Sequence, residues 1–160
     1  DFTGQMLPLA KAKAKRAQLN LRWVQADAEV LPFGDNSFDT VTISFGIRNV
    51  HQPKHALREC FRVLRPGGKL GVLDFFPMKS SIWRTLFRIY FCHVLPVLAR
   101  IFLVGRGGAY RYLPESVEGF VSAEGFVTWL HEVGFEQIRS IPLTGGVAHF
   151  QSGVKKNLHG

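Results

Sequence analysis

The chain has 160 residues, which is the size of one domain and enough for a hydrophobic core. Hydrophobic residues make up 46% of the chain, which excludes a disordered polymer. The formal net charge is +8, from 20 Lys and Arg against 12 Asp and Glu, which fits either an anionic partner or solubility alone. The two cysteines, Cys60 and Cys92, are too few and too far apart for a disulfide framework or a metal site, so a reducing compartment is the simpler inference.

The first predicted element is an amphipathic helix. Thr3 can serve as its N-cap, apolar residues then recur at helical spacing, and the helix is expected to stop near Asn20. Residues 21–24 are predicted to form a short strand, and Asp27 follows it. The Pro and Gly-Asp-Asn content of residues 32–36 predicts a turn.

The next stretch, residues 38–50 (FDTVTISFGIRNV), predicts a buried strand whose carboxyl end opens into a loop. In an open α/β sheet, ligands sit at the carboxyl ends of strands, so this loop is expected to form the floor of the active site. Arg48 in this loop is either paired with a carboxylate or directed at a ligand. Its guanidinium stays protonated, so it would stabilise an oxyanion or orient water rather than act as a base.

A helix is predicted to start at Pro53 and to end at residues 65–68 (RPGG), where a basic last turn meets helix breakers. Local chemistry explains this segment as a cap and turn. Residues 70–73 predict a strand that ends at Asp74. Strand, helix and strand at this spacing predict a parallel sheet with right-handed crossovers.

Residues 82–104 are strongly apolar and aromatic, with cationic residues at intervals. The longest run without charge, between Arg88 and Arg100, is 11 residues, against the roughly 20 that a spanning helix needs. Three interpretations remain open: a core helix pair, a hydrophobic lid over the site, or an interfacial helix. Residues 110–112 (YRY) resemble an aromatic and basic nucleic-acid surface, but no recognition motif supports it, so no nucleic-acid partner is expected.

The remaining elements are a helix and a hairpin. The helix is predicted from an N-cap at Ser122 to Gly134, and a strand follows over residues 135–141. Residues 147–150 are expected to begin its hairpin partner. The chain from Gly153 is expected to be a polar tail.

Two acids at strand ends suggest a nucleoside pocket when taken together. Asp1, at the end of a strand, can accept hydrogen bonds from both hydroxyls of a ribose. Asp27 could accept a bond from an adenine amino group while the backbone N–H of Ala28 donates to the ring. The sequence contains no P-loop, no Gly-x-Ser-x-Gly and no zinc pattern.

Several motifs occur in an order that is characteristic of one family. They are DAEVLPF (27–33), FGIRNV (45–50), RVLRPGG (62–68), YRYL (110–113) and LTGG (143–146). Over nearly its whole length the chain closely resembles the ubiquinone/menaquinone biosynthesis C-methyltransferases, a class I S-adenosylmethionine-dependent family. The segments FGIRNV and RVLRPGG are specific for this family, whereas the general class I features alone would not identify it.

The resemblance implies an α/β, Rossmann-like fold with a mostly parallel seven-stranded sheet, here without its N-terminal strand and helix. Residues 1–160 would then be the larger, C-terminal part of a single methyltransferase domain, with residues 79–116 as a hydrophobic lid or substrate insertion. The family's glycine-rich motif should precede Asp1. We therefore expect a fragment of a longer protein that by itself binds the cofactor poorly.

The resemblance also implies the cofactor and the roles of the site residues. The cofactor is S-adenosylmethionine: Asp1 would bind its ribose, Asp27 and Ala28 its adenine, and Ser44 its methionine end. Arg48 and Asn49 would face the substrate, a demethylated polyprenyl quinol that is methylated on a ring carbon. No metal is implied.

The implied setting is cytoplasmic and peripheral, at the inner face of the membrane, and a homo-oligomer is left open. Two alternatives also stay open. One is a non-catalytic, basic, membrane-peripheral binding module that has lost the cofactor site. The other is a methyltransferase for another lipid-like acceptor, such as a sterol.

Overall fold

The computed structural model describes residues 6–77 and 116–156 of the chain. In chain order the elements are α1 (Met6–Arg16), β1 (Phe38–Ser44), the 3₁₀ helix η1 (Ile47–Asn49), α2 (Pro53–Val63), β2 (Leu64–Phe75), α6 (Ala123–Val133), β3 (Phe135–Leu143), the 3₁₀ helix η3 (Thr144–Gly146) and β4 (Ala148–Lys155). Asp1 and the predicted lid over residues 79–116, apart from Ser116, lie outside the described residues.

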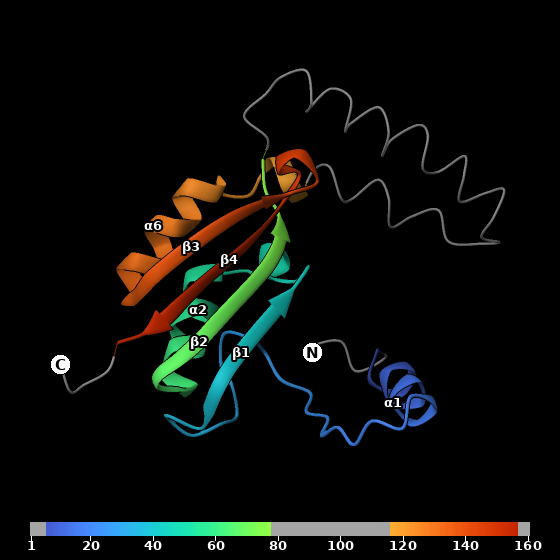
Figure 1. Ribbon diagram of the computed structural model, residues 1–160. Helices are drawn as coiled ribbons and strands as arrows, with labels where there is room; N and C mark the ends of the chain where they lie inside the picture. Colours follow the sequence, from blue (N-terminus) through green and yellow to red (C-terminus); the bar gives the residue numbers. More distant parts are fainter. Residues whose placement is uncertain (1–5, 78–115, 157–160) are drawn as a thin grey trace, which may run out of the picture.

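The four strands form one sheet in the order β1-β2-β4-β3 (Figure 1). β1 and β2 are parallel, whereas β4 is antiparallel to both β2 and β3. The predicted α/β class is confirmed. The described residues contain these four strands of the seven that the resemblance implies.

The N-terminal helix forms as predicted, but it ends at Arg16 rather than near Asn20. The strand predicted over residues 21–24 is wrong, because these residues adopt no regular structure. Leu21 and Val24 are both largely exposed. A strand needs a neighbour to satisfy its backbone N–H and C=O groups, and in the described sheet β1 is paired with β2 alone.

The predicted strand–helix–strand unit is confirmed by β1, α2 and β2. Pro53 occupies the first turn of α2, where its missing N–H costs no hydrogen bond. The RPGG segment is an irregularity at the start of β2, where the register with β1 shifts. A side chain on Gly68 would place its Cβ 2.7 Å from the carbonyl oxygen of Arg65, so this close approach requires glycine.

α6 begins and ends where the sequence predicts. The Ser122 hydroxyl accepts a hydrogen bond from the Gly125 N–H at 3.1 Å, and Gly134 ends the helix with a left-handed φ of 110°. The β3–β4 hairpin is also confirmed. The polar tail predicted from Gly153 is wrong: β4 continues to Lys155, because Val154 pairs with both β2 and β3 and Lys155 pairs with Phe135 of β3.

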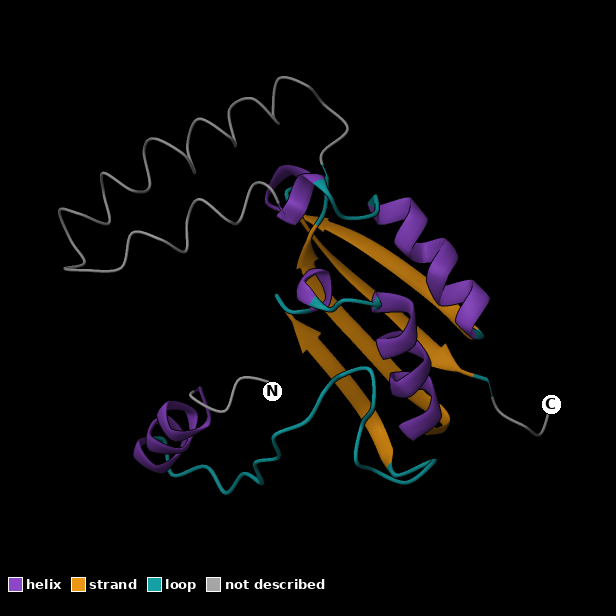
Figure 2. Ribbon diagram, turned by 180° about the vertical axis from the view of Figure 1, so that it is seen from behind, coloured by secondary structure: helices purple, strands orange, loops and turns teal. Residues whose placement is uncertain are grey.

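α2 and α6 cover the same face of the sheet (Figures 1 and 2). Their apolar sides pack with buried residues of β2 and β3 in one core, which accounts for most of the buried hydrophobic residues. Its buried members are Ile47, Ala56, Leu57, Cys60, Leu64, Leu70, Val72, Phe76, Ala123, Phe126, Leu130 and Phe135.

Lys155, at the end of β4, binds the C-terminal end of α2. Its Nζ donates to the carbonyl oxygens of Phe61 and Leu64, both at 2.7 Å, and lies 4.7 Å from the centre of the Phe61 ring. The last carbonyls of a helix lack partners within the helix, and a cation there also meets the negative end of the helix dipole. Burial lowers the pKa of Lys155.

Replacing Lys155 with Met should destabilise the fold. The stem would still pack, but the carbonyls at the end of α2 would lose their donor, so the free energy of unfolding should fall by about 1–3 kcal/mol. Urea denaturation measures the loss. Lys156→Met is the matched control, since the Lys156 side chain is 66% exposed and lies 3.6 Å from Glu136. Equal stability of the two variants would contradict the capping role.

Candidate functional site

The carboxyl ends of the two parallel strands lie side by side. Ser44, the last residue of β1, is in register with Leu73, and the N–H of Phe45 donates to the Leu73 carbonyl oxygen at 2.8 Å. The chain then turns through η1, which Ile47 anchors because its side chain is fully buried. This turn places Arg48 beside the end of β2.

The Arg48 side chain is bound by the acid at the end of β2. Its Nη1 forms an ion pair with Asp74 Oδ1, and its backbone N–H donates to Asp74 Oδ2 at 3.4 Å. Its Nε donates to the Ser116 hydroxyl at 3.4 Å, and its guanidinium carbon lies 5.4 Å from the centre of the Phe75 ring. Four contacts thus fix the loop and the guanidinium together.

This ion pair is buried. The side chains are 8% exposed for Arg48 and 0% exposed for Asp74. Asp74 Oδ1 also accepts from the Phe75 N–H at 2.8 Å. A buried charge pair needs supporting hydrogen bonds, and these bonds supply them for the Asp74 carboxylate and for Nη1 and Nε of Arg48. Among the described residues the bonds of Arg48 use Nη1 and Nε, which leaves Nη2 as a fixed donor for a ligand.

Two aromatic rings lie beside the pair. The Phe45 and Phe75 ring centres are 5.0 Å apart. Phe45 is 44% exposed and has a positive φ of 54°, a conformation that a bulky residue adopts only when its surroundings impose it. The site therefore combines a fixed cation with apolar aromatic surface.

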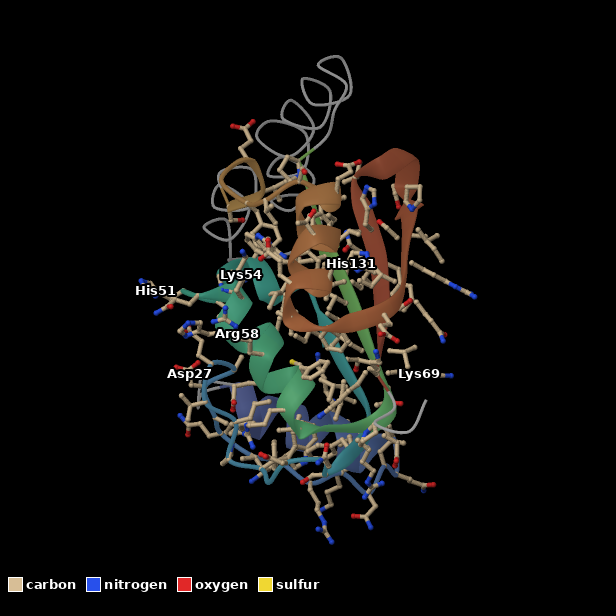
Figure 3. All side chains as sticks on the ribbon, turned by 90° about the vertical axis from the view of Figure 1, so that its left-hand side faces the viewer. Asp27, His51, Lys54, Arg58, Lys69 and His131 are labelled. Carbon is tan, nitrogen blue, oxygen red and sulfur yellow. The ribbon has the colours of Figure 1, made fainter. Side chains whose placement is uncertain are left out.

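The predicted adenine-binding residues form a tight turn. Asp27 is exposed, and its Oδ1 accepts a hydrogen bond from the Glu29 N–H at 2.9 Å. The Val30 N–H donates to the Asp27 carbonyl oxygen at 3.2 Å. Ala28 is half-buried and packs against the core. Figure 3 shows Asp27 on the same side of the molecule as His51, Lys54 and Arg58.

The structure brings three of the predicted site residues to one edge of the sheet: Ser44, Arg48 and Asn49. Ser44 and Asn49 are exposed there, and the Asn49 N–H donates to the Gly46 carbonyl oxygen at 3.1 Å. The predicted role of Asp1 is not addressed by the described residues.

Sequence reasoning missed the partners of Arg48. Asp74 had a signal, because an acid that ends the strand following Arg48 in a parallel unit comes to the same edge. Ser116 had none, since it is 68 residues away in sequence from Arg48.

Neither cysteine nor metal chemistry is indicated within residues 6–77 and 116–156. Burial raises the pKa of the Cys60 thiol to about 12, so the thiol stays neutral and unreactive. No three His, Cys, Asp or Glu side chains in this part of the chain gather in a way that could hold a metal ion.

The fold matches solved structures of methyltransferases. An S-adenosylmethionine-dependent methyltransferase from Aquifex aeolicus superimposes with a TM-score of 0.65 and 17% identity over 96% of this chain and 65% of its own. A putative methyltransferase from Bacillus halodurans gives a TM-score of 0.67 and 17% identity over 98% of this chain and 81% of its own. The fold is therefore that of the S-adenosylmethionine-dependent methyltransferases.

Sequence comparison identifies the family within this class. The model of the ubiE/COQ5 methyltransferase family matches residues 1–155, and the chain belongs to this family. A demethylmenaquinone methyltransferase from Thermus thermophilus is 45% identical over 96% of this chain. A ubiquinone/menaquinone biosynthesis C-methyltransferase from Roseobacter denitrificans is 40% identical over 97%. The chain spans 69% and 62% of the lengths of these two relatives.

The buried pair yields a stability prediction. Asp74→Asn keeps the side-chain shape but leaves the Arg48 guanidinium buried without its countercharge, so the free energy of unfolding should fall by about 3 kcal/mol or more. Urea denaturation measures it. Asp39→Asn is the control, because the Asp39 carboxylate is 81% exposed where it pairs with Arg65, and its loss should cost less than about 1 kcal/mol. If the free energy of unfolding fell by a similar amount in both variants, the buried pair would contribute no more to stability than the exposed one.

Proposed function

We propose that the protein methylates a ring carbon of a demethylated polyprenyl quinol, with S-adenosylmethionine as methyl donor. The names of the relatives support the reaction and the substrate class. The observation in the structure that carries the proposal is the Arg48 guanidinium, fixed by Asp74 at the carboxyl ends of two parallel strands, where α/β folds bind their ligands.

The residues present fit the donor's nucleoside. Asp27 Oδ1 accepts from its own turn, and the exposed carboxylate has further acceptor capacity for an adenine amino group. The half-buried Ala28 supplies apolar surface next to it. Ser44, exposed at the tip of β1, would bind the methionine end, and Asp1 the ribose. When bound, S-adenosylmethionine supplies an electrophilic methyl group on a sulfonium.

The remaining chemistry belongs to the acceptor and to Arg48. Loss of a proton from one quinol hydroxyl to solvent makes the neighbouring ring carbon nucleophilic and leaves negative charge on the oxygen. That carbon would take the methyl group as the bond between methyl and sulfur breaks, and its own hydrogen would then pass as a proton through solvent to the quinol oxygen, which restores the aromatic ring. The guanidinium of Arg48 stabilises this charge without reorganising, because Asp74 and Ser116 already fix its plane. Asn49, exposed at the end of η1, would orient the ring. The Phe45 and Phe75 rings would exclude water from the reacting carbon.

We further propose that the protein works at a membrane surface, on the cytoplasmic side. The substrate's polyprenyl tail resides in lipid, and the chain's net charge of +8 favours anionic headgroups. None of the helices in the described residues has both the length and the apolar character to cross a bilayer.

The catalytic proposal predicts the effect of Arg48→Lys in the complete protein. Lys keeps a cation beside Asp74, but it lacks the planar fork, so kcat should fall about 100-fold while the Kd for S-adenosylmethionine stays unchanged. A steady-state assay with a demethylated quinol, together with calorimetric titration of the donor, measures both. Arg65→Lys, on an exposed ion pair, is the control. Undiminished turnover in Arg48→Lys would remove Arg48 from the mechanism.

The assay also separates the alternatives. A wild-type protein that binds no S-adenosylmethionine would be a non-catalytic module. A protein that binds the donor and methylates a sterol but no quinol would have another lipid-like acceptor.

The membrane proposal predicts salt-sensitive binding to anionic lipid. The complete protein should sediment with vesicles that contain phosphatidylglycerol, and less so as salt rises, because the attraction is screened within about 10 Å at 0.1 M salt. Neutralising Lys11, Lys13 and Lys15 on α1 should weaken sedimentation. Equal sedimentation with vesicles of phosphatidylcholine alone would contradict a charge-based contact.

A further inference from the structure

The segment that follows Asp27 lies along α2 and is attached to that helix at both ends. At the start of α2, the Gln52 N–H donates to Glu29 Oε1 at 2.8 Å. Toward the end of α2, Glu59 Oε2 accepts from the Leu31 N–H at 2.8 Å. Residues 31–36 contain no helix or strand, so these side-chain bonds take the place of regular backbone pairing.

Arg62 makes most of these attachments. Its Nη2 donates to the Leu31 carbonyl oxygen at 3.0 Å, and its Nη1 donates to the Phe33 carbonyl oxygen at 2.8 Å and to Asp35 Oδ1 at 2.8 Å. Its Nε and Nη2 also bind the two Glu59 carboxylate oxygens, at 2.7 and 2.8 Å. The guanidinium thus joins one helix to three successive points of an irregular segment.

The ion pair between Glu59 and Arg62 is partly buried and also binds a second segment of the chain. The side chains are 32% exposed for Arg62 and 19% for Glu59, and both bind backbone groups of another segment. The hydrogen bond from Arg62 lowers the pKa of the Glu59 carboxyl. The carboxylate therefore adds stability that is present above its ordinary pKa and is lost as the pH falls through the lowered value.

The attachments continue to the turn that carries the adenine-binding residues. Leu31 follows Val30 directly, and the Val30 N–H donates to the Asp27 carbonyl oxygen at 3.2 Å. Glu29, attached to Gln52, donates its own N–H to the Asp27 carboxylate. A shift of residues 29–31 relative to α2 would therefore move both the carboxylate and the backbone of Asp27.

We infer that Glu59 and Arg62 are positioning residues for the cofactor: by fixing residues 31–35 on α2, they hold the preceding Asp27–Ala28 turn where it binds adenine. This inference rests on the proposed function. α2 also packs beside η1, which carries Arg48. One helix thus contacts both the segment that holds the adenine-binding turn and the 3₁₀ helix that carries the guanidinium.

The test is Arg62→Ala in the complete protein, followed by calorimetric titration with S-adenosylmethionine and by steady-state kinetics. Losing several charge-assisted bonds should raise the Kd and the KM for the donor about tenfold. At saturating donor, kcat and the KM for the quinol should stay within about twofold, because Arg62 does not touch the reacting groups. Arg62→Lys keeps the charge and part of the bonding, so it should restore part of the affinity.

Arg65→Ala is the matched control. It removes an arginine from the same region, but Arg65 binds Asp39 and the Asn36 carbonyl oxygen instead of residues 29–35. Its donor Kd should equal that of the wild type. An unchanged donor Kd in Arg62→Ala, or an equal rise in Arg65→Ala, would overturn the positioning role.

Glu59→Gln decides the matter if Arg62→Ala does not fold. It removes the carboxylate that binds the Leu31 N–H and Arg62, and it should raise the donor Kd about threefold, whereas an unchanged Kd would overturn the inference. A wild-type protein that binds no donor would overturn the proposed function together with the inference. Wild-type binding with undiminished binding in both variants would overturn the positioning role alone.

Discussion

The buried ion pair between Arg48 and Asp74 is the constraint on which the rest of the site depends. It joins the loop after β1 to the end of β2, and both charges are withdrawn from water. Separating the two side chains would leave an uncompensated charge in the protein interior, which is strongly destabilising. The pair therefore fixes the loop conformation and the strand end together. A guanidinium held in this way can stabilise a developing charge without moving, so no free energy is lost to reorganisation during the reaction.

α2 connects this pair with the opposite side of the proposed site. Its apolar side, which includes Ala56, Leu57 and Cys60, packs into the core that α6 and the sheet complete. Its other side binds the irregular segment after Asp27 through Glu59 and Arg62. Lys155 then caps its last carbonyls from β4. A single helix therefore packs into the core, holds the irregular segment and is capped by Lys155, and different residues of the helix make each of these contacts.

Local chemistry predicted those elements whose signals lie within a few residues. Ser122 and Gly134 mark both ends of α6, and strand–helix–strand spacing gives the parallel pair of β1 and β2. The prediction failed where pairing with a distant segment decides the outcome. Residues 21–24 have strand composition but are not part of the described sheet, and the chain beyond Gly153 has polar composition but is paired with β3.

The same distinction applies to the site. The strand and loop predicted over residues 38–50 placed Ser44 and Arg48 at the carboxyl end of β1, because the local pattern of an apolar run followed by a glycine-containing loop carries that information. The contact of Arg48 with Ser116 and the contacts of Arg62 with residues 31–35 depend on how distant segments fold together, and no spacing in the sequence encodes them.

The most direct test of the account is a crystal structure of the complete protein with S-adenosylhomocysteine and a demethylated quinol. The account predicts that Arg48 stays paired with Asp74 and that its Nη2 lies about 3 Å from a quinol oxygen, which is hydrogen-bond distance. A quinol ring bound elsewhere, or an Arg48 side chain turned away into solvent, would contradict it.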